Sequence, residues 1–332
     1  MSFEALWLEM EGAAVAQNGV LRRRVLPNAA CDLFVGVEHP SRRRALLLRL
    51  PQAETPALES APQARGVEMR MGRLPDDPTD CTSVVLALAD EACRDIFSVL
   101  VDDIAAHVGA AATARTAVEQ FLSRFARWQA FLERFGPDGL SDSAQRGLFG
   151  ELWFLRWYLL PVGSGTVDAW MGPKMAPQDF HLPGLAVEVK TTTSKQHQKL
   201  RISGERQLEI SASLRIIIFH ISLDAHRDTG LSLVELVAGI RAQLATTPLA
   251  LATFNEGLLE AGYLDVHAQR YGRTGYIERE RHFFEVRGDF PRIVGTDLRA
   301  GVGDVFYSIS VAECLHYEIP EADVRLLLTA VL

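Results

Sequence analysis

The sequence predicts an α/β protein whose core is a mixed β-sheet flanked by helices, with a β-rich N-terminal region and an α+β C-terminal region. Several short apolar runs bounded by turn formers fill the N-terminal region. Two amphipathic helical patterns follow, and short strands then alternate with loops and helices. We expect three domains: residues 1–110, a core at 111–225, and residues 226–332.

Length and composition favour a globular protein. The chain has 332 residues, of which 48% are hydrophobic, enough for a sizeable core. No apolar run reaches the roughly 18 to 20 residues of a membrane span, and the strongest, residues 214–221, is interrupted by Arg215. The N-terminus lacks a basic segment followed by an apolar one, the pattern that marks export. We expect a cytoplasmic protein without a membrane partner.

The four cysteines show no metal-binding spacing. Cys31, Cys81, Cys93 and Cys314 form no C-x-x-C pair and match no histidine spacing. This pattern argues against a structural zinc site and against a disulfide framework. We expect buried thiols.

The charge pattern bears on nucleic-acid binding in two ways. A net charge of -8 argues against it, because phosphate binding usually leaves a basic footprint. Residues 187–206, however, carry five basic side chains and two acidic ones. Two arginine triplets, at 22–24 and 42–44, could touch a phosphate backbone, but solvated edge strands are the preferred interpretation.

The N-terminal region has the pattern of a sheet followed by helices. Strands are expected at residues 20–26, 31–37, 45–50, 66–71 and 82–88, with a flexible loop at 51–63. A helix should begin at Asp90 and run to about residue 107. Apolar residues at helical spacing from Val118 to Phe135 predict a second helix, which Gly136-Pro137 should end.

The next helix carries a candidate site residue. Ser141 can cap it, and its apolar stripe consists of leucines, with Glu151 inside or beside that stripe. An unpaired buried charge costs several kcal/mol, so Glu151 needs a partner. That partner is either a metal site or a neighbouring arginine, Arg146 or Arg156. Gly147 and Gly150 each cost about 1 kcal/mol in a helix, which close approach of another backbone would explain.

A charged hairpin is expected at residues 179–190. Residues 179–182 and 185–190 have strand patterns, and Pro183-Gly184 signals a turn. Glu188 and Lys190 leave the same face of the second strand, and the hairpin can bring Asp179 beside them. Carboxylate oxygens suit Mg²⁺, which activates water for phosphodiester hydrolysis, while an ammonium orients that water or offsets developing charge. The alternative is that Glu188 and Lys190 are solvated or pair with each other.

The rest of the chain is expected to add strands and helices around this hairpin. Strands are predicted at 200–202, 214–221, 282–286 and 305–309, a polar turn at 203–209, and helices at 232–244 and 250–261. His181 could share the face of Asp179, but structural roles are expected for it, His220 and His226. Neither a P-loop nor a nucleophile elbow is present.

Three motifs together resemble those of a known superfamily. Glu151 lies in Gly147-Leu-Phe-Gly-Glu-Leu-Trp-Phe, Asp179 follows Gln178, and Glu188-Val-Lys190 precedes three threonines. This set resembles the PD-(D/E)XK phosphodiesterase superfamily, which has the restriction-endonuclease-like fold. It is also similar to a bacterial group of PD-(D/E)XK family members of similar length, often found among restriction and phage-defence genes. The likeness would extend over most of the chain.

The resemblance implies roles for individual residues. Asp179 and Glu188 would ligate Mg²⁺, with Mn²⁺ as a possible substitute, and Glu151 would complete or support the site. Lys190 would act on the attacking water, and Gln207 falls where some members carry an accessory glutamine. The first motif departs from the family pattern, because Gln178 precedes Asp179 and Pro177 stands one place early.

Two functions of different class follow. The first is a Mg²⁺-dependent DNA endonuclease of a bacterial restriction or phage-defence system, acting with other proteins of that system. A homodimer would supply one active site for each DNA strand. The second is a non-cleaving nuclease-fold subunit that serves as a DNA- or protein-binding platform, as the acidic net charge and large flanking regions would allow. Three carboxylates close together favour the first, because without a cation they repel one another.

Overall fold

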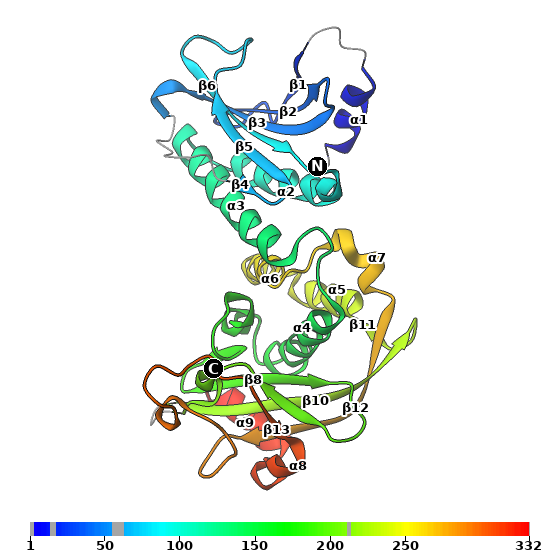
Figure 1. The fold of residues 1–332 in the computed structure, drawn as a ribbon, viewed down its shortest axis with the longest axis vertical. Coiled ribbons are helices and arrows are strands. Elements are labelled where there is room, and N and C mark those ends of the chain that lie inside the picture. Colours follow the sequence, from blue (N-terminus) through cyan, green and yellow to red (C-terminus); the bar gives the residue numbers. More distant parts are fainter. Residues whose placement is uncertain (1–2, 14–17, 55–62, 211–213, 332) are drawn as a thin grey trace. The chain divides into compact units, whose positions relative to one another are not determined.

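The computed structural model describes residues 3–13, 18–54, 63–210 and 214–331 of the 332-residue chain. The chain divides into two compact units, Met1–Gly139 and Leu140–Leu332. Both units combine helices with strands, so the predicted α/β class is confirmed (Figure 1). Within the described residues, no helix is long and apolar enough to cross a membrane.

The first unit is built on a six-stranded antiparallel sheet with strand order β1-β2-β3-β6-β5-β4. The five predicted strands are all present, and the short β4 adds a sixth. Most of the expected loop at 51–63 lies outside the described residues. The strands are β1 (Gly19–Val25), β2 (Asp32–His39), β3 (Arg43–Pro51), β4 (Gln63–Ala64), β5 (Val67–Gly72) and β6 (Cys81–Leu88).

Three helices accompany this sheet: α1 (Glu4–Gly12), α2 (Arg94–Gly109) and α3 (Ala114–Phe135). The side chain of Asp90 caps the 3₁₀ turn that leads into α2, close to the predicted start. Thr113 begins α3 with a capping box, and Gly136, at φ 64°, ends it as predicted. Figure 1 shows α2 and α3 along one face of the sheet.

The arginine triplets of the first unit form ion pairs within that unit. Arg44 is 1% exposed and pairs with Glu4 at 2.6 Å and Glu11 at 2.7 Å. Arg22, Arg23, Arg24 and Arg43 pair with Asp77, Glu9, Asp32 and Glu68. Acidic side chains, rather than solvent alone, therefore neutralise these five arginines.

The second unit contains a five-stranded mixed sheet with strand order β11-β12-β10-β8-β7. Only β8 and β10 are parallel, and the remaining neighbours are antiparallel. A separate two-stranded sheet pairs β9 with β13. The strands are β7 (Phe180–Leu182), β8 (Leu185–Thr192), β9 (Lys199–Ile202), β10 (Arg215–Arg227), β11 (Leu231–Ser232), β12 (Thr274–Glu285) and β13 (Tyr307–Ser310).

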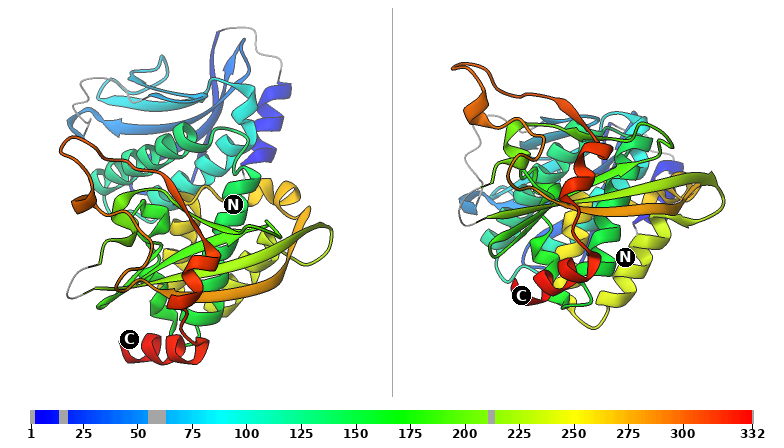
Figure 2. Two further views of the ribbon diagram at one scale, coloured as in Figure 1. Left: turned by 60° about the horizontal axis from the view of Figure 1, so that its bottom comes forward. Right: turned by 90° about the horizontal axis from the view of Figure 1, so that it is seen from below.

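The five-stranded sheet is covered on both faces. Helix α4 (Asp142–Phe154) packs on one face, where a Cβ on Gly150 would come within 2.2 Å of Thr191 Cγ2. Gly150 therefore permits a close approach of side chains rather than of the backbone that was expected, and a Cβ on Gly147 would meet open space, so the expectation for Gly147 is wrong. On the other face, β9, β13 and α8 (Val311–Cys314) bury an apolar cluster that includes Ile218. Figures 1 and 2 show α4 and α8 on opposite sides of the sheet.

The remaining helices lie in the same unit. Ser232 caps α5 with a capping box, and α6 follows it, so both helices expected after β10 are confirmed. A short α7 precedes β12, and α9 follows β13. Their bounds are α5 (Leu233–Leu244), α6 (Pro248–Glu260), α7 (Ala268–Tyr271) and α9 (Glu321–Val331).

The three domains expected from the sequence differ from the two compact units. Helix α3, expected in the core at 111–225, packs against α2 in the first unit. Strand β12, expected in the region at 226–332, pairs along β10 inside the core sheet. The three-domain division therefore stays a prediction about independent folding. All four cysteines are free, and Cys31, Cys93 and Cys314 are buried.

Candidate active site

The charged hairpin is present. Strands β7 and β8 pair antiparallel, with Phe180 opposite Val187, and Gly184 turns the chain at φ 70°. Such a φ is open to glycine and strained for most other residues. Glu188 and Lys190 leave the face of β8 that carries Ala186, opposite the face on which α4 packs.

Glu188 and Lys190 form a buried ion pair. Lys190 Nζ lies 2.6 Å from Glu188 Oε1, and Glu188 is only 2% exposed. The alternative in which Glu188 and Lys190 pair with each other is therefore present, and the pair lies in the protein interior rather than in solvent. Glu188 Oε2 is buried and accepts no hydrogen bond from any described residue. A buried, unpartnered carboxylate oxygen is costly unless a proton or a cation satisfies it.

Asp179 is held from two directions. Its Oδ2 accepts a hydrogen bond from the backbone N–H of Val189 at 2.7 Å. Its backbone carbonyl accepts hydrogen bonds from the N–H groups of Met171 at 2.7 Å and Gly172 at 3.0 Å. The carboxylate is thus fixed beside β8, one residue before Lys190, with Oδ1 left for another contact.

Glu151 reaches the same place from α4. The indole N–H of the buried Trp170 donates to Glu151 Oε2 at 2.8 Å. A Cβ on Gly172 would lie 2.6 Å from Glu151 Oε2 and 3.0 Å from Asp179 Oδ1, so both carboxylates lie close to Gly172. Among the described residues, no arginine forms an ion pair with Glu151. The inward-facing carboxylate is instead stabilised by the hydrogen bond from Trp170.

Two glutamines connect the hairpin to the 3₁₀ turn Glu205–Leu208. Lys190 Nζ donates to Gln207 Oε1 at 3.3 Å, and the same oxygen accepts from Ser203 N–H at 2.9 Å. The buried Gln178 donates its amide hydrogens to the carbonyls of Arg206 at 3.1 Å and Gln207 at 2.9 Å. Gln178, at the position where the motif has proline, therefore positions Gln207 against Lys190.

The structure brings together all five predicted site residues: Glu151, Asp179, Glu188, Lys190 and Gln207. Sequence reasoning did not assign site roles to Trp170, Gly172 and Gln178. The Trp170-Met171-Gly172-Pro173 run just before Asp179 marks a turn, but a connection without periodicity carries no signal for the residues that it contacts.

The candidate histidines do not join this group. His181 contacts Gln178, with 3.0 Å between His181 Nε2 and Gln178 Oε1, and is exposed. His220 is fully buried and stacks on His282, and burial lowers the pKa of His220 to about 4. His220 is therefore neutral at physiological pH, in agreement with the structural role expected for it.

The three carboxyl groups hold protons more tightly than usual. Burial raises the pKa of Asp179 to about 6. Burial and the nearby Asp179 charge raise the pKa of Glu188 to about 8, although Lys190 opposes this shift. Burial, followed by the charge of Asp179, also raises the pKa of Glu151 well above its ordinary value. Burial, more than mutual repulsion, thus disfavours the ionised forms of these carboxyl groups, and a divalent cation would stabilise those forms.

The donor set fits a hard cation by chemical type, since all three candidate ligands are carboxylates and Glu188 Oε2 has no partner. Within the described ranges, however, no three His, Cys, Asp or Glu side chains are already arranged to hold a metal ion. Glu188 Oε1 contacts Lys190 Nζ, and Glu151 Oε2 accepts a hydrogen bond from Trp170. Cation binding would require these side chains to adjust.

Replacing Gly172 tests this arrangement. In Gly172→Ala, the new Cβ would come within 2.6 Å of Glu151 Oε2, so the carboxylate must move. We expect weaker divalent-metal binding, with a melting temperature within a few degrees of the wild type, measured by metal titration and by thermal unfolding. Gly165→Ala is the matched control, since a Cβ there meets open space. Equal metal binding by both variants would contradict the expected crowding.

A comparison with family models identifies the family of the chain. The model described as "Putative PD-(D/E)XK family member, (DUF4420)" matches residues 3–312. Comparison with curated proteins and with solved structures gives no match. Most members of the PD-(D/E)XK superfamily are nucleases, and they generally use divalent metals. Because the match spans nearly the whole chain, the protein belongs to the PD-(D/E)XK family described as DUF4420.

Proposed function

We propose that the protein is a Mg²⁺-dependent DNA endonuclease that hydrolyses phosphodiester bonds. The observation that carries this proposal is the meeting of Glu151, Asp179 and Glu188 with Lys190, from a helix and a hairpin, at one edge of a mixed sheet. A site of buried carboxylates with raised pKa values and one ammonium is suited to binding a cation next to a phosphate.

Each residue has a role in this proposal. Asp179, fixed by Val189 N–H, and Glu188, through its unpartnered Oε2, would hold Mg²⁺, with Glu151 in support. When bound, the cation supplies Lewis-acid polarisation of the phosphoryl oxygen and a more acidic water. Lys190, positioned by Gln207, would orient the attacking water or offset negative charge in the transition state.

The biological setting belongs to the same proposal. We place the protein in the cytoplasm, in a bacterial restriction or phage-defence system with DNA and other proteins of that system as partners. A homodimer would allow both strands to be cut. The resemblance of the three motifs to the bacterial group found among such genes supports this setting.

The test is cleavage of plasmid and linear DNA by the purified protein with Mg²⁺, with Mn²⁺ and with a chelator, beside Lys190→Ala. We expect metal-dependent nicking or cutting that the variant lacks. Cutting by Lys190→Ala at the wild-type rate would remove Lys190 from the mechanism. Cleavage in the presence of the chelator would show that the reaction does not need a metal ion.

A second function has its own supporting observation. The Glu188–Lys190 pair is closed at 2.6 Å, and within the described ranges no three side chains are prearranged around a metal position. A platform that binds DNA without cutting it could keep such a pair for stability. Tight, salt-sensitive DNA binding with no metal-dependent turnover would favour this function.

A further inference from the structure

A cavity of about 240 Å³ opens directly beside Lys190. One wall consists of residues 191–194, which are the last two residues of β8 and the two that follow it, and Arg146, Lys199 and Arg201 complete the cavity. The lining consists only of cationic and hydroxyl-bearing residues. Ligand pockets for drug-sized molecules are typically about 300–1,000 Å³ and mostly apolar, so this cavity suits a small anion instead.

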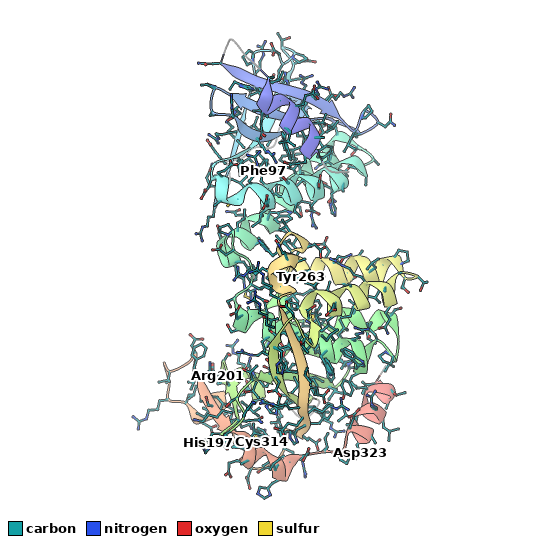
Figure 3. The ribbon with its side chains drawn as sticks, turned by 90° about the vertical axis from the view of Figure 1, so that its right-hand side faces the viewer. Phe97, His197, Arg201, Tyr263, Cys314 and Asp323 are labelled. Atoms are coloured by element: carbon teal, nitrogen blue, oxygen red, sulfur yellow. The ribbon has the colours of Figure 1, made fainter. Side chains whose placement is uncertain are left out.

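Three of the cationic residues that line the cavity, Arg146, Lys199 and Arg201, come from two elements that pack on the sheet independently. Arg146 projects from α4, whereas Lys199 and Arg201 alternate on β9, whose other residues, Leu200 and Ile202, are buried. Figure 3 labels Arg201 on this strand. Strand pairing with β13 fixes β9, so the two cations are held on one exposed face.

Within the part of the chain that the structure describes, Arg146, Lys199 and Arg201 have no acidic partners. No described residue forms an ion pair with Arg146, Lys199 or Arg201, whereas five arginines of the first unit are paired. Unpaired like charges around a cavity repel one another, and an anion in the cavity removes that repulsion. In a chain with a net charge of -8, such a concentration of free positive charge calls for a ligand.

The hydroxyl wall is ordered by its own hydrogen bonds. Ser194 N–H donates to Thr192 Oγ1 at 3.1 Å, and the guanidinium of Arg279 donates to the Ser194 carbonyl at 2.7 Å. Arg279 is in turn held by Ser222 and Asp224 of β10. The backbone of residues 192–194 is therefore anchored to the core sheet, which keeps the wall in place beside Lys190.

We infer that this cavity binds a phosphate group of the polynucleotide strand, close to the phosphate that is hydrolysed at Lys190. The inference rests on the proposed function and deepens it, because it assigns the path of the strand: from the carboxylates past Lys190, along residues 191–194, to Arg146, Lys199 and Arg201. Three residues of extended chain span about 10 Å, so the cavity lies near the reacting centre. The contact is to backbone charge and carries no base specificity.

The first test measures DNA binding over a series of salt concentrations. The full-length protein is kept in chelator to prevent cleavage, and fluorescence anisotropy follows a labelled duplex. Lys199→Gln/Arg201→Gln should bind more weakly and should lower the slope of log affinity against log salt by about 1, since the loss of one phosphate contact removes about 0.9. Lys195→Gln is the matched control, because Lys195 is 79% exposed in the same connection and does not line the cavity.

The second test locates the bound phosphate. Duplexes that carry a neutral methylphosphonate at one linkage at a time are compared in the wild type and in Lys199→Gln/Arg201→Gln. At one linkage near the cleavage position, neutralisation should weaken wild-type binding severalfold and leave the double variant unaffected. Such non-additivity is the signature of a direct contact.

The outcomes separate this inference from the proposed function. If the wild type cleaves DNA with metal but the double variant keeps the wild-type salt slope, the cavity assignment is overturned and the nuclease stands. If the slope falls as expected but no metal-dependent cleavage occurs, the cavity assignment stands and the nuclease does not. Binding of inorganic phosphate that Lys199→Gln/Arg201→Gln abolishes, with an unchanged DNA slope, would assign the cavity to a free anion and overturn the inference.

Discussion

Glu188→Gln should reduce metal-dependent DNA cleavage about a thousandfold or more. The glutamine preserves the shape of the side chain and can still accept a hydrogen bond from Lys190, which lies 2.6 Å from Glu188 Oε1. It removes the anionic oxygen that is buried without a partner and that would ligate the cation. A metal supplies several kcal/mol of transition-state stabilisation, and each 1.36 kcal/mol is tenfold in rate, so about 4 kcal/mol gives this loss.

The matched control is Glu209→Gln. Glu209 is exposed and follows the 3₁₀ turn that carries Gln207, so the same chemical change is made nearby without touching the carboxylate cluster. Single-turnover nicking of supercoiled plasmid measures the rate, and circular dichroism verifies that both variants are folded. If Glu188→Gln kept more than about a tenth of the wild-type rate, Glu188 would not be a metal ligand in the reaction.

The elements near this residue could be predicted because their signals are local. Alternating residues on either side of Pro183-Gly184 are enough to predict the hairpin of β7 and β8. Ser141 and the apolar stripe after it predict α4 with Glu151 inside or beside that stripe. Two local patterns thus placed the carboxylates on separate elements, and the motif resemblance predicted that they meet.

The long-range pairings could not be predicted in the same way. Strand β10 continues through Arg227, well beyond its apolar part, because its polar end pairs with β12 across a register shift at Ser222 and Leu223. Hydrophobic periodicity indicates which residues are buried, so the more exposed end of a strand gives a weaker signal. The ion pairs of the arginine triplets could not be predicted because the acidic partners are distant in sequence. Arg44, for example, pairs with Glu4.

The inner contacts of the site were also beyond sequence reasoning. Trp170 and Gly172 reach Glu151 and Asp179 only because the connection before β7 folds back on the hairpin, where Met171 and Gly172 donate to the Asp179 carbonyl. A connection without periodicity gives no information about its path. In the sequence, Gln178 was interpreted as a departure from the motif. Its side chain nevertheless donates a hydrogen bond to the backbone carbonyl of Gln207.

The metal-free protein should lose stability as pH rises from about 6.5 to about 8, above the range in which the lowered pKa of the buried His220 has the opposite effect. Glu188 has a pKa of about 8 in the folded protein, against an ordinary value of 4.5, and Asp179 a pKa of about 6, against 3.8. The folded state therefore binds more protons than the unfolded state between these values, and its free energy of unfolding falls as pH increases. The part of the loss that comes from Asp179 and Glu188 should be complete above the folded pKa of Glu188. Thermal unfolding in chelator measures it.

Mg²⁺ should reverse this loss, and it should do so most strongly at high pH. A cation and protons compete for the same carboxylates, so the metal binds best where the carboxylates are ionised, and ligand binding to the folded state raises the melting temperature. We expect a larger Mg²⁺-induced shift at about pH 8.5 than at about pH 5.5. Each 1 kcal/mol added to the free energy of unfolding should raise the melting temperature by about 2–4 °C in a unit of this size.

Glu188→Gln links the two predictions, because the residue that holds the cation is also the one that destabilises the empty site. In chelator at about pH 8.5, the variant should melt at a higher temperature than the wild type, since it carries no charge that must be buried. Its pH profile should be flatter and its Mg²⁺ shift smaller, with Glu209→Gln behaving as the wild type. A variant that is less stable than the wild type at every pH would indicate instead that the Glu188–Lys190 pair is structural, and would favour the binding platform.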